Sequence, residues 1–453
     1  MRKSKLYHFL LLCTLLVGFK TLSAEQATLD ALGVLPGTSL SFASGISDDG
    51  GTVVGGSTTN HFGIQSLRSH PVGQAFIWGA AGGMVRLAAL NQDHDSSWAE
   101  GISADGKIVV GAATDAAGQF VPVRWDQGQP TSLALPSGGS GTAVVISADG
   151  STIVGIDGLS HVLRWRHGRP ESLLAAPFLN YAEFAISASG NDGVVCLTAN
   201  DNLFRWSDPL GALPARISPT ALDGLTHNFR AAAMTADGQR FFVSTSGDSS
   251  LAPNGAYQWT GLNDGQPIPT YQAAAAYGYI PRLATSASGN LLAATAITTA
   301  ALPDNGAILI TPFGPLPFAP LLQAQGADTS RWAALTNITA MSADGRWLAG
   351  AGGLAGAVGA PGQIVAFRAK LVLHAEGEPA LKVSATTDVF NRTTTDLRWP
   401  ASDLLVTVES VPALHPALPW QPEVGTPRIE GNEIVLRLYQ SNGPRYFRLR
   451  RLD

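Results

Sequence analysis

The stretch AEGISADGKIVVG at residues 99–111 decides the fold, because its central Ser-Ala-Asp-Gly phrase recurs along the chain. Close variants of this phrase occupy seven positions: residues 47–50, 103–106, 147–150, 187–190, 235–238, 286–289 and 342–345. Their closing glycines follow one another at intervals of 40 to 56 residues. A regular spacing of this length is typical of repeat architectures.

The second unit shows what each repeat contains. Small residues at 99–103 lead to a tight turn, after which Lys107–Gly111 is a β-branched run. Val121–Trp125 and Thr131–Leu135 are two further runs, separated by a turn at Gly128. Four short runs punctuated by Asp-Gly and Gly-Gln turns predict a four-stranded antiparallel meander.

Seven such meanders predict an all-β protein with a seven-bladed β-propeller. A solenoid is the competing architecture, although its repeats are shorter and more even. Thr28–Pro36 resembles a fourth strand but precedes the first unit. We therefore expect it to pair beside the third strand of the seventh unit and close the ring, which removes an exposed sheet edge.

Several strands are placed less clearly by the repeat. The second strand of the fourth unit is expected at Gly193–Cys196, and the third strand of the seventh at Ala366–Arg368. Leu316–Leu322 is expected as the fourth strand of the sixth unit. Leu371–His374 matches a fourth strand, but with Thr28–Pro36 in that place it is either the exit from the propeller or a fifth strand.

Aromatic residues end most of the third strands. Small residues in the first strands fit a crowded central axis, so the large rings are expected to fill the space between neighbouring blades. The tryptophans in question are Trp78, Trp125, Trp165, Trp206 and Trp259.

The repeat phrase stops near residue 373. Residues 373–453 contain five or six short apolar or alternating runs, which predicts a small β-sandwich following the propeller at 25–372. Trp399 and Trp420 are its expected core anchors. The basic end of the chain is either a solvated strand face or a docking or sorting signal; it comprises Arg445, Arg448, Arg450 and Arg451.

Composition limits the class of protein. Charged residues make up 14% of the chain, and the net charge of −5 offers no basic face for nucleic acid. Residues 1–24 combine a basic start, an apolar core and a small residue at Ala24, as secretory signal peptides do. Cleavage there leaves Cys196 as the single cysteine and no transmembrane segment in the mature chain. We expect a secreted or cell-envelope protein.

The repeat resembles a known family. The pattern A-x-G-I-S-x-D-G-x-x-V-V-G followed by A-F-x-W, clearest at Ala43–Gly55 with Ala75–Trp78, is similar to the HAF repeats of bacterial extracellular proteins. The resemblance covers about residues 28–370 and implies a secreted, propeller-like protein with no common enzymatic activity. The C-terminal piece is similar to sandwich modules of secreted bacterial proteins.

No motif for nucleophilic, metal or phosphate chemistry is present, so neither a cofactor nor a metal is expected. The aspartates of the repeated phrase are explained by turns, in which Asp caps its own backbone and Gly takes a positive φ. Calcium binding would require several converging oxygens.

Ligands of propellers meet one face, which is built from the loops that lead into the first strands and the loops between second and third strands. The loops into the first strands supply the candidate ligand-binding residues His94, Asp95, Trp98, Tyr181, His227, Tyr279, Arg282 and Trp332. Any one of them could instead pack between blades or be ordinary surface. We expect a monomeric, non-catalytic propeller that binds carbohydrate or protein. The alternative is a polysaccharide hydrolase or lyase, whose acids would come from Asp93, Asp95, Glu100, Glu183, Asp223 and Asp328.

Overall fold

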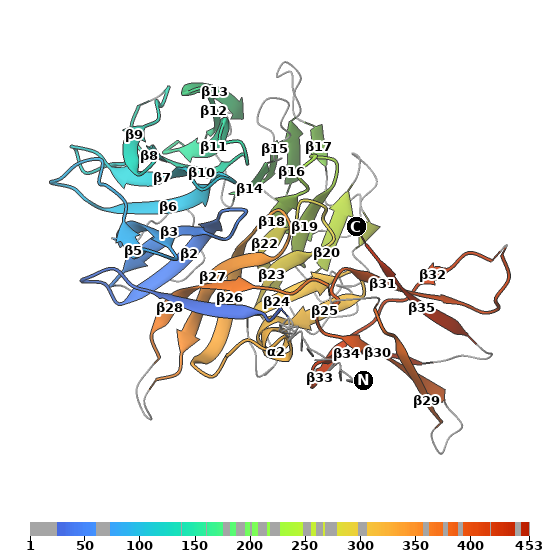
Figure 1. The fold of residues 1–453 in the computed structure, drawn as a ribbon. Coiled ribbons are helices and arrows are strands. Elements are labelled where there is room, and N and C mark those ends of the chain that lie inside the picture. Colours follow the sequence, from blue (N-terminus) through green and yellow to red (C-terminus); the bar gives the residue numbers. More distant parts are fainter. Residues whose placement is uncertain are drawn as a thin grey trace, which may run out of the picture.

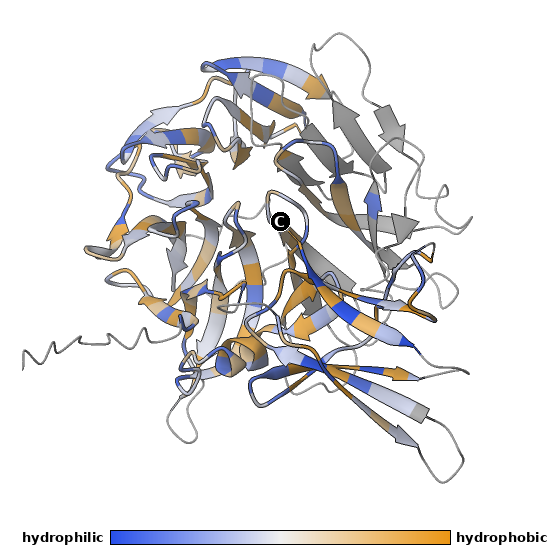
Figure 2. Ribbon diagram, turned by 45° about the vertical axis from the view of Figure 1, so that its right-hand side comes forward, coloured by the Kyte–Doolittle hydropathy of each residue, from blue (hydrophilic) through white to orange (hydrophobic). Residues whose placement is uncertain are grey.

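The chain forms a ring of β-sheets with a second β-structure beside it (Figure 1, Figure 2). The structure is a computed structural model. It describes residues 25–59, 73–136, 138–159, 161–174, 182–186, 195–199, 202–206, 215–217, 227–247, 255–259, 266–267, 279–297, 306–356, 362–374, 379–387, 393–416, 418–439 and 445–452. Within this part of the chain, seven four-stranded antiparallel sheets form the blades of a propeller.

The first four blades each use four consecutive strands. Blade 1 consists of β2 (Leu40–Ile46), β3 (Thr52–Thr58), β4 (Gly73–Gly79) and β5 (Gly83–Arg86). Blade 2 consists of β6 (Ser97–Ile102), β7 (Ile108–Thr114), β8 (Phe120–Asp126) and β9 (Gln129–Ser132). Blade 3 consists of β10 (Gly141–Ile146), β11 (Thr152–Asp157), β12 (Val162–Arg166) and β13 (Arg169–Leu174). Blade 4 consists of β14 (Ala182–Ile186), β15 (Val195–Ala199), β16 (Asn202–Trp206) and β17 (Ala215–Ile217).

Two further blades repeat this order, and the last one departs from it. Blade 5 consists of β18 (His227–Met234), β19 (Phe241–Gly247), β20 (Gly255–Trp259) and β21 (Gln266–Pro267). Blade 6 consists of β22 (Tyr279–Thr285), β23 (Leu292–Ile297), β24 (Ala307–Thr311) and β25 (Gly314–Pro317). Blade 7 consists of β26 (Trp332–Met341), β27 (Trp347–Leu354), β28 (Ile364–Lys370) and the N-terminal strand β1 (Thr28–Gly33).

The ring is closed. The first strand of every blade contacts the first strand of the next, and β26 of blade 7 contacts β2 of blade 1. Strand β1 pairs antiparallel with β28, as the sequence predicts, so that Asp30 lies opposite Arg368. In the same way, Arg164 of the third strand of blade 3 lies opposite Glu171 of its fourth strand. The N-terminal strand therefore takes the place of a fourth strand in blade 7.

A bulge in the first strand explains the glycine that ends the V-V-G run of the repeat. The register of β2 against β3 shifts between Ala43 and Gly45. The Phe42 carbonyl turns toward Gly55, where an added Cβ would lie 2.0 Å from its oxygen. The same 2.0 Å approach recurs at Gly111, Gly155 and Gly350. Glycine permits this close backbone contact in four blades.

The third-strand tryptophans whose surroundings are described fill the space between blades, as predicted. Trp125 is fully buried, packs with Val54 and Leu87 of blade 1, and donates its Nε1 hydrogen to the Ala88 carbonyl at 2.8 Å. Trp165 repeats the arrangement one blade later with a 2.7 Å bond to Ala134. Buried indole rings with a satisfied N–H are typical core anchors.

Some sequence expectations were wrong. The fourth strand of blade 6 ends at Pro317, and the helix α2 (Phe318–Ala324) replaces the rest of the predicted Leu316–Leu322 strand. Its buried Phe318, Leu321 and Leu322 have helical spacing, and Pro320 lies in the first turn, where its missing N–H costs nothing.

Two predicted strands differ in extent or register. The second strand of blade 4 is described at Val195–Ala199 and extends three residues beyond the predicted Gly193–Cys196, of which the first two residues lie outside the described part. In blades 1 and 2, the third-strand tryptophan pairs with the residue three positions after the turn glycine. In blade 7 this residue is Leu348, and it pairs with Ala369 rather than with the expected Arg368. Leu371–His374 is the exit from the propeller and not a fourth strand.

The C-terminal module consists of two small sheets. The first has the order β29 (Lys382–Thr387), β30 (Thr393–Pro400), β34 (Glu433–Tyr439) and β33 (Arg428–Glu430). The second has the order β32 (Gln421–Pro422), β31 (Val406–Val411) and β35 (Tyr446–Arg451). Hydrophobic and hydrophilic stretches alternate along these strands in Figure 2, as in a two-layered sandwich.

The sandwich and blade 6 share one hydrophobic core. Trp399 of β30 is fully buried, as predicted, and its ring meets that of Phe313 edge-on at 4.8 Å between centroids. The buried Gln325 amide after α2 joins the parts: it donates to the carbonyls of Val372 and Ala401, both at 2.8 Å. The Gln325 carbonyl also accepts from Ala27. Trp420, the other expected anchor, is only half-buried.

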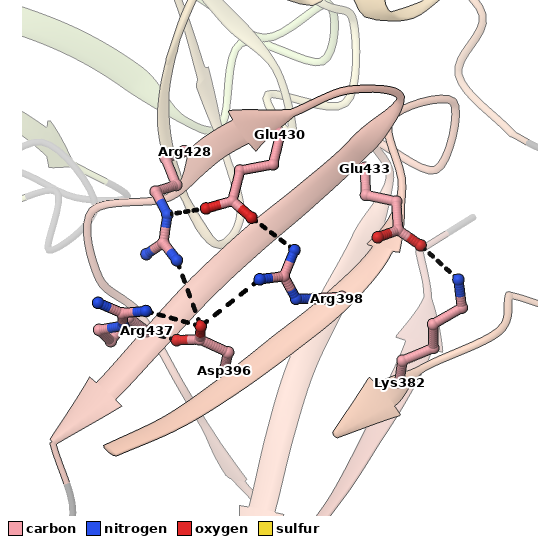
Figure 3. Close-up of polar contacts among 7 residues, drawn as sticks. All are labelled: Lys382, Asp396, Arg398, Arg428, Glu430, Glu433 and Arg437. Carbon is pink, nitrogen blue, oxygen red and sulfur yellow. Dashed lines mark hydrogen bonds and ion pairs between the residues drawn. The ribbon is translucent and has the colours of Figure 1, made fainter. Parts of the chain in front are cut away.

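An ion network covers the outer side of the first sandwich sheet (Figure 3). Asp396 accepts from Arg437 at 2.7 and 2.8 Å, and Arg428 and Arg398 lie 3.2 and 3.7 Å away. The Arg437 hydrogen bonds hold the pKa of Asp396 below its usual range. Glu430 pairs with Arg398 and Arg428 in turn, so the network ties three strands together.

Candidate functional site

The propeller has two chemically different faces. The first strands all run in the same direction, so the loops that lead into them lie on one face, with the hairpins between second and third strands. We term this face the loop rim. The repeated Ser-x-Asp-Gly turns follow the first strands and therefore lie on the opposite face, which we term the turn face.

Between blades 1 and 2, the loop rim presents Arg86, His94 and Asp95. The Asp95 carboxylate lies 2.8 Å from Nη2 of Arg86, and the two side chains are 51% and 33% exposed. Arg86 also donates to the Asp95 carbonyl at 2.9 Å. The exposed His94 ring borders the β7–β8 hairpin, because a Cβ added at Gly118 would lie 3.5 Å from it.

Hydrogen bonds from neighbouring side chains hold this loop in place. Asn91 accepts from the backbone N–H groups of Asp93 and His94, and Thr114 donates to the His94 carbonyl at 2.5 Å. Asp115 accepts two backbone N–H groups within its own hairpin. The exposed side chains are therefore carried by loops with fixed backbone conformations.

The β11–β12 hairpin of blade 3 extends the loop rim. The buried Asp157 carboxylate accepts from the backbone N–H groups of Leu159 and His161, and its other oxygen lies 2.9 Å from Nδ1 of His161. These bonds leave Leu159 60% exposed at the tip. Sequence reasoning placed such hairpins on the ligand face but chose its residues from the entry loops alone, so it missed Leu159 and His161. It also missed Arg86, which ends the strand before the entry loop of blade 2.

Two of the predicted ligand-binding residues have packing partners. Trp98 is half-buried against blade 1. A Cβ added at Gly56 would lie 2.2 Å from the Trp98 ring, and the centroids of the Trp98 and Phe42 rings are 6.4 Å apart. Trp332 is half-buried against Gly352 and meets Phe367 edge-on at 5.9 Å. Both rings therefore contribute to the frame, and a ligand-binding role for them stays a prediction.

The remaining predicted residues are placed only in part. Tyr181 lies outside the described residues. The backbones of His227, Tyr279 and Arg282 belong to the first strands β18 and β22, while their side chains lie outside the described part. The fold thus distributes the predicted residues over several blades of one face.

On the turn face, the five described turns that end in Asp-Gly close with the same hydrogen bonds. In the first, the buried Ser47 hydroxyl donates to Asp49 at 2.6 Å and accepts from the Thr52 N–H at 2.9 Å. Asp49 also accepts from the N–H of Gly51, and Gly50 has a φ of +66°. The predicted capping role of Asp and the positive φ of Gly are both confirmed, and the serine adds a buried link that sequence reasoning missed.

Neighbouring turns are joined to one another around the axis. The N–H of Asp48 donates to the Ala104 carbonyl, and that of Ala104 to the Ala148 carbonyl, both at 2.9 Å. Ala236 donates to Ala287, and Ala287 to Ala343, in the same way. At the closure the Ala343 N–H donates to the carboxylate of Asp48 at 2.8 Å. Asp48 stands at the junction of the first and last blades, where the other six turn phrases have alanine at the same position.

These bonds also set the charge state of the turn carboxylates. A hydrogen bond from Ser47 lowers the pKa of Asp49, and one from Thr235 lowers that of Asp237. Hydrogen bonds from Lys107 and Ser103 lower the pKa of Asp105 to about 2. Among the described residues, no group of His, Cys, Asp and Glu side chains could hold a metal ion.

The comparisons with known proteins do not assign a family. No family model and no curated protein matches the chain. A solved structure described as "Crystal Structure of Mitotic Checkpoint Complex" aligns with 81% of this chain and 98% of its own, at 14% identity and a TM-score of 0.44. A likeness this distant assigns neither ligand nor activity. In the part of the chain that the structure describes, no helix is long and apolar enough to span a membrane.

Proposed function

We propose that this protein is an exported, non-catalytic binding propeller that holds a carbohydrate or protein ligand on its loop rim. The carrying observation is the contrast between the two faces. The described Asp-Gly turns of the turn face repeat one hydrogen-bonding scheme, whereas the described loop rim presents different side chains between blades 1 and 2 and in blade 3. Uniform turns stabilise a frame, and varied loops on a rigid frame suit recognition.

The side chains of the loop rim suit polar recognition. Between blades 1 and 2 it offers a guanidinium, a carboxylate and an imidazole on a restrained loop, and blade 3 adds the exposed Leu159. Restrained loops lose little conformational entropy when a ligand binds. Hydrogen-bonding groups and an exposed apolar residue on the same face fit a sugar or a peptide.

Export to the cell envelope or the medium belongs to the same proposal. It rests on the signal-like residues 1–24 and on the resemblance to HAF repeats. We expect the mature chain to begin at Glu25 and to be monomeric. Amino-terminal sequencing and light scattering of the secreted protein test these two points; a retained leader or a stable dimer would contradict them.

The binding experiment uses purified residues 25–453 on a glycan array and against extracellular proteins. A His94→Ala/Asp95→Asn variant removes the polar groups of the loop rim. Asp126→Asn is the matched control, because its ion pair with Arg124, at 57% and 30% exposed, resembles that of Asp95 with Arg86. Since Asp126 ends a third strand, it lies toward the turn face.

We expect the wild type and Asp126→Asn to bind the same ligand, and the loop-rim variant to lose at least about tenfold in affinity, or about 1.4 kcal/mol. Equal binding by all three proteins would place the site elsewhere. Any ligand should be recovered unchanged after incubation. Turnover of a polysaccharide that is lost with Asp95→Asn would replace this proposal by the hydrolase or lyase alternative.

A further inference from the structure

A proline-rich loop at one end of the sandwich exposes an apolar surface. It joins β31 to β32 over residues 412–420, and its described residues 412–416, 418 and 419 are all exposed. Leu414 and Leu418 are 67% and 39% exposed. From Val411 to Pro422 the chain contains no Asp, Glu, Lys or Arg. An exposed surface of this kind marks an interaction site. We term residues 412–416, 418 and 419 the apolar loop.

Aromatic and basic residues lie behind the apolar loop in a fixed order. Tyr446 is 44% exposed and pairs with Val411, where β31 ends and the loop begins. The half-buried Trp420 ends the loop. Arg448 pairs with Glu409, two residues further from the loop, with its Cζ 4.3 Å from the Trp420 ring centroid. At about 3.4 Å per residue, the arginine lies about 7 Å behind Tyr446.

The basic groups are held in place and remain accessible. Arg448 and Arg450 both pair with Glu409, at 2.6 and 2.8 Å. The Glu409 side chain is only 8% exposed, whereas those of the arginines are 45% and 54% exposed. The buried carboxylate therefore anchors two guanidinium groups whose outer N–H donors face solvent.

This order matches the layers of a membrane interface. Leucine side chains enter the hydrocarbon boundary, Trp and Tyr lie at headgroup depth, and Arg pairs with lipid phosphates. We infer that the apolar loop inserts into the surface of a lipid bilayer and that the arginines behind it contact anionic headgroups. The surface is a projecting loop stiffened by Pro412, Pro416 and Pro419, which suits insertion better than enclosure of a partner.

Two leucines are too few for permanent anchoring, since even one myristoyl chain gives only reversible binding. The loop therefore supports weak membrane association of the C-terminal module. This inference is independent of the loop rim, which belongs to the propeller, and it gives the sandwich a role in attachment.

The test is co-sedimentation of residues 25–453 with vesicles. One set is phosphatidylcholine alone, and the other an equal mixture of phosphatidylcholine and phosphatidylglycerol. The test variant is Leu414→Asp/Leu418→Asp. The matched control is Val85→Asp/Val383→Asp, which makes the same charge change at valines that are 54% and 52% exposed outside the loop. All four substitutions are at exposed positions, and unchanged circular dichroism confirms folding.

We expect the wild type and the valine control to bind the mixed vesicles, more weakly at high salt, and to bind phosphatidylcholine less. The leucine variant should partition at least about tenfold more weakly, because each buried leucine contributes more than 1 kcal/mol. No binding of the wild type to mixed vesicles would overturn the inference, as would equal binding of the leucine variant. A loop-dependent protein partner without vesicle binding would assign the surface to a protein instead.

Discussion

Arg368 of β28 offers the sharpest test of how the ring is closed. Its Nε and Nη2 donate to Asp30 of β1 at 3.1 and 2.7 Å, and Nη1 donates to the Gly50 carbonyl of blade 1 at 2.9 Å. The guanidinium also lies over the rings of Trp78 and Trp347, at 4.6 and 4.8 Å. One side chain thus joins the last blade, the N-terminal strand and the first blade.

The substitution Arg368→Met keeps the aliphatic stem and removes these contacts. The lost hydrogen bond to Gly50 costs about 1.5 kcal/mol, and each cation–π contact about 0.5–1 kcal/mol. Asp30 is 41% exposed and regains water, so its ion pair adds no more than about 1 kcal/mol. We expect a loss of about 3 kcal/mol in the free energy of unfolding, measured by urea denaturation.

Arg164→Met is the matched control, because Arg164 pairs with Glu171 in the same register inside blade 3. Both variants should be less stable, and hydrogen exchange separates them. Only Arg368→Met should speed the exchange of the backbone amides of residues 28–33. Equal protection of these amides in both variants would refute the role of Arg368 in closure.

Four further substitutions test the frame. Gly55→Ala should lower the free energy of unfolding, measured by urea denaturation, by about 1–3 kcal/mol, because the new Cβ would meet the Phe42 carbonyl. Gly353→Ala is the control and should be neutral, because no atom lies within 4 Å of its added Cβ. Equal urea midpoints for the two variants would contradict the bulge. Ser103→Ala removes two hydrogen bonds of a buried hydroxyl and should lower the free energy of unfolding by about 1–2 kcal/mol. In the folded protein the pKa of Asp105 is lowered to about 2, so the charged carboxylate stabilises the fold fully above its ordinary pKa near 3.9, and this stabilisation is lost as the pH falls toward 2. The difference in free energy of unfolding between the wild type and Asp105→Asn should therefore shrink over that pH range. A constant difference would count against this role of Asp105. Trp98→Ala should lower the thermal midpoint through about 2 kcal/mol of lost packing on blade 1, and an unchanged midpoint would return Trp98 to the candidate ligand site.

The repeat made the propeller predictable, because turn phrases and third-strand tryptophans are local signals. The N-terminal strand was predictable for the same reason: Thr28–Pro36 has the pattern of a fourth strand, and the first unit did not need one. Where the local signal weakened, the register was lost. Without a tryptophan, the third strand of blade 7 was shifted by one residue, and a helix was read as a strand at Leu316–Leu322.

Some contacts between particular residues of neighbouring blades were not predictable. Burial of Trp98 depends on a glycine at residue 56 in the neighbouring blade. The bonds between turns join Ala104 to Ala148, and Ala343 to Asp48, across gaps that no local pattern spans. The candidate site was recovered only in part, because the candidate residues were chosen from the loops into the first strands and not from the hairpins between second and third strands on the same face.

The most direct test of the closed ring is a disulfide between the N-terminal strand and blade 7. Thr28 and Lys370 are directly paired, and such pairs have Cα separations of about 4.5–5.5 Å, within disulfide range. In residues 25–453 carrying Cys196→Ser, Thr28→Cys/Lys370→Cys should form an intramolecular disulfide on mild oxidation, detected by faster migration in a non-reducing gel. Two free thiols in the folded, oxidised protein would show that β1 does not complete blade 7.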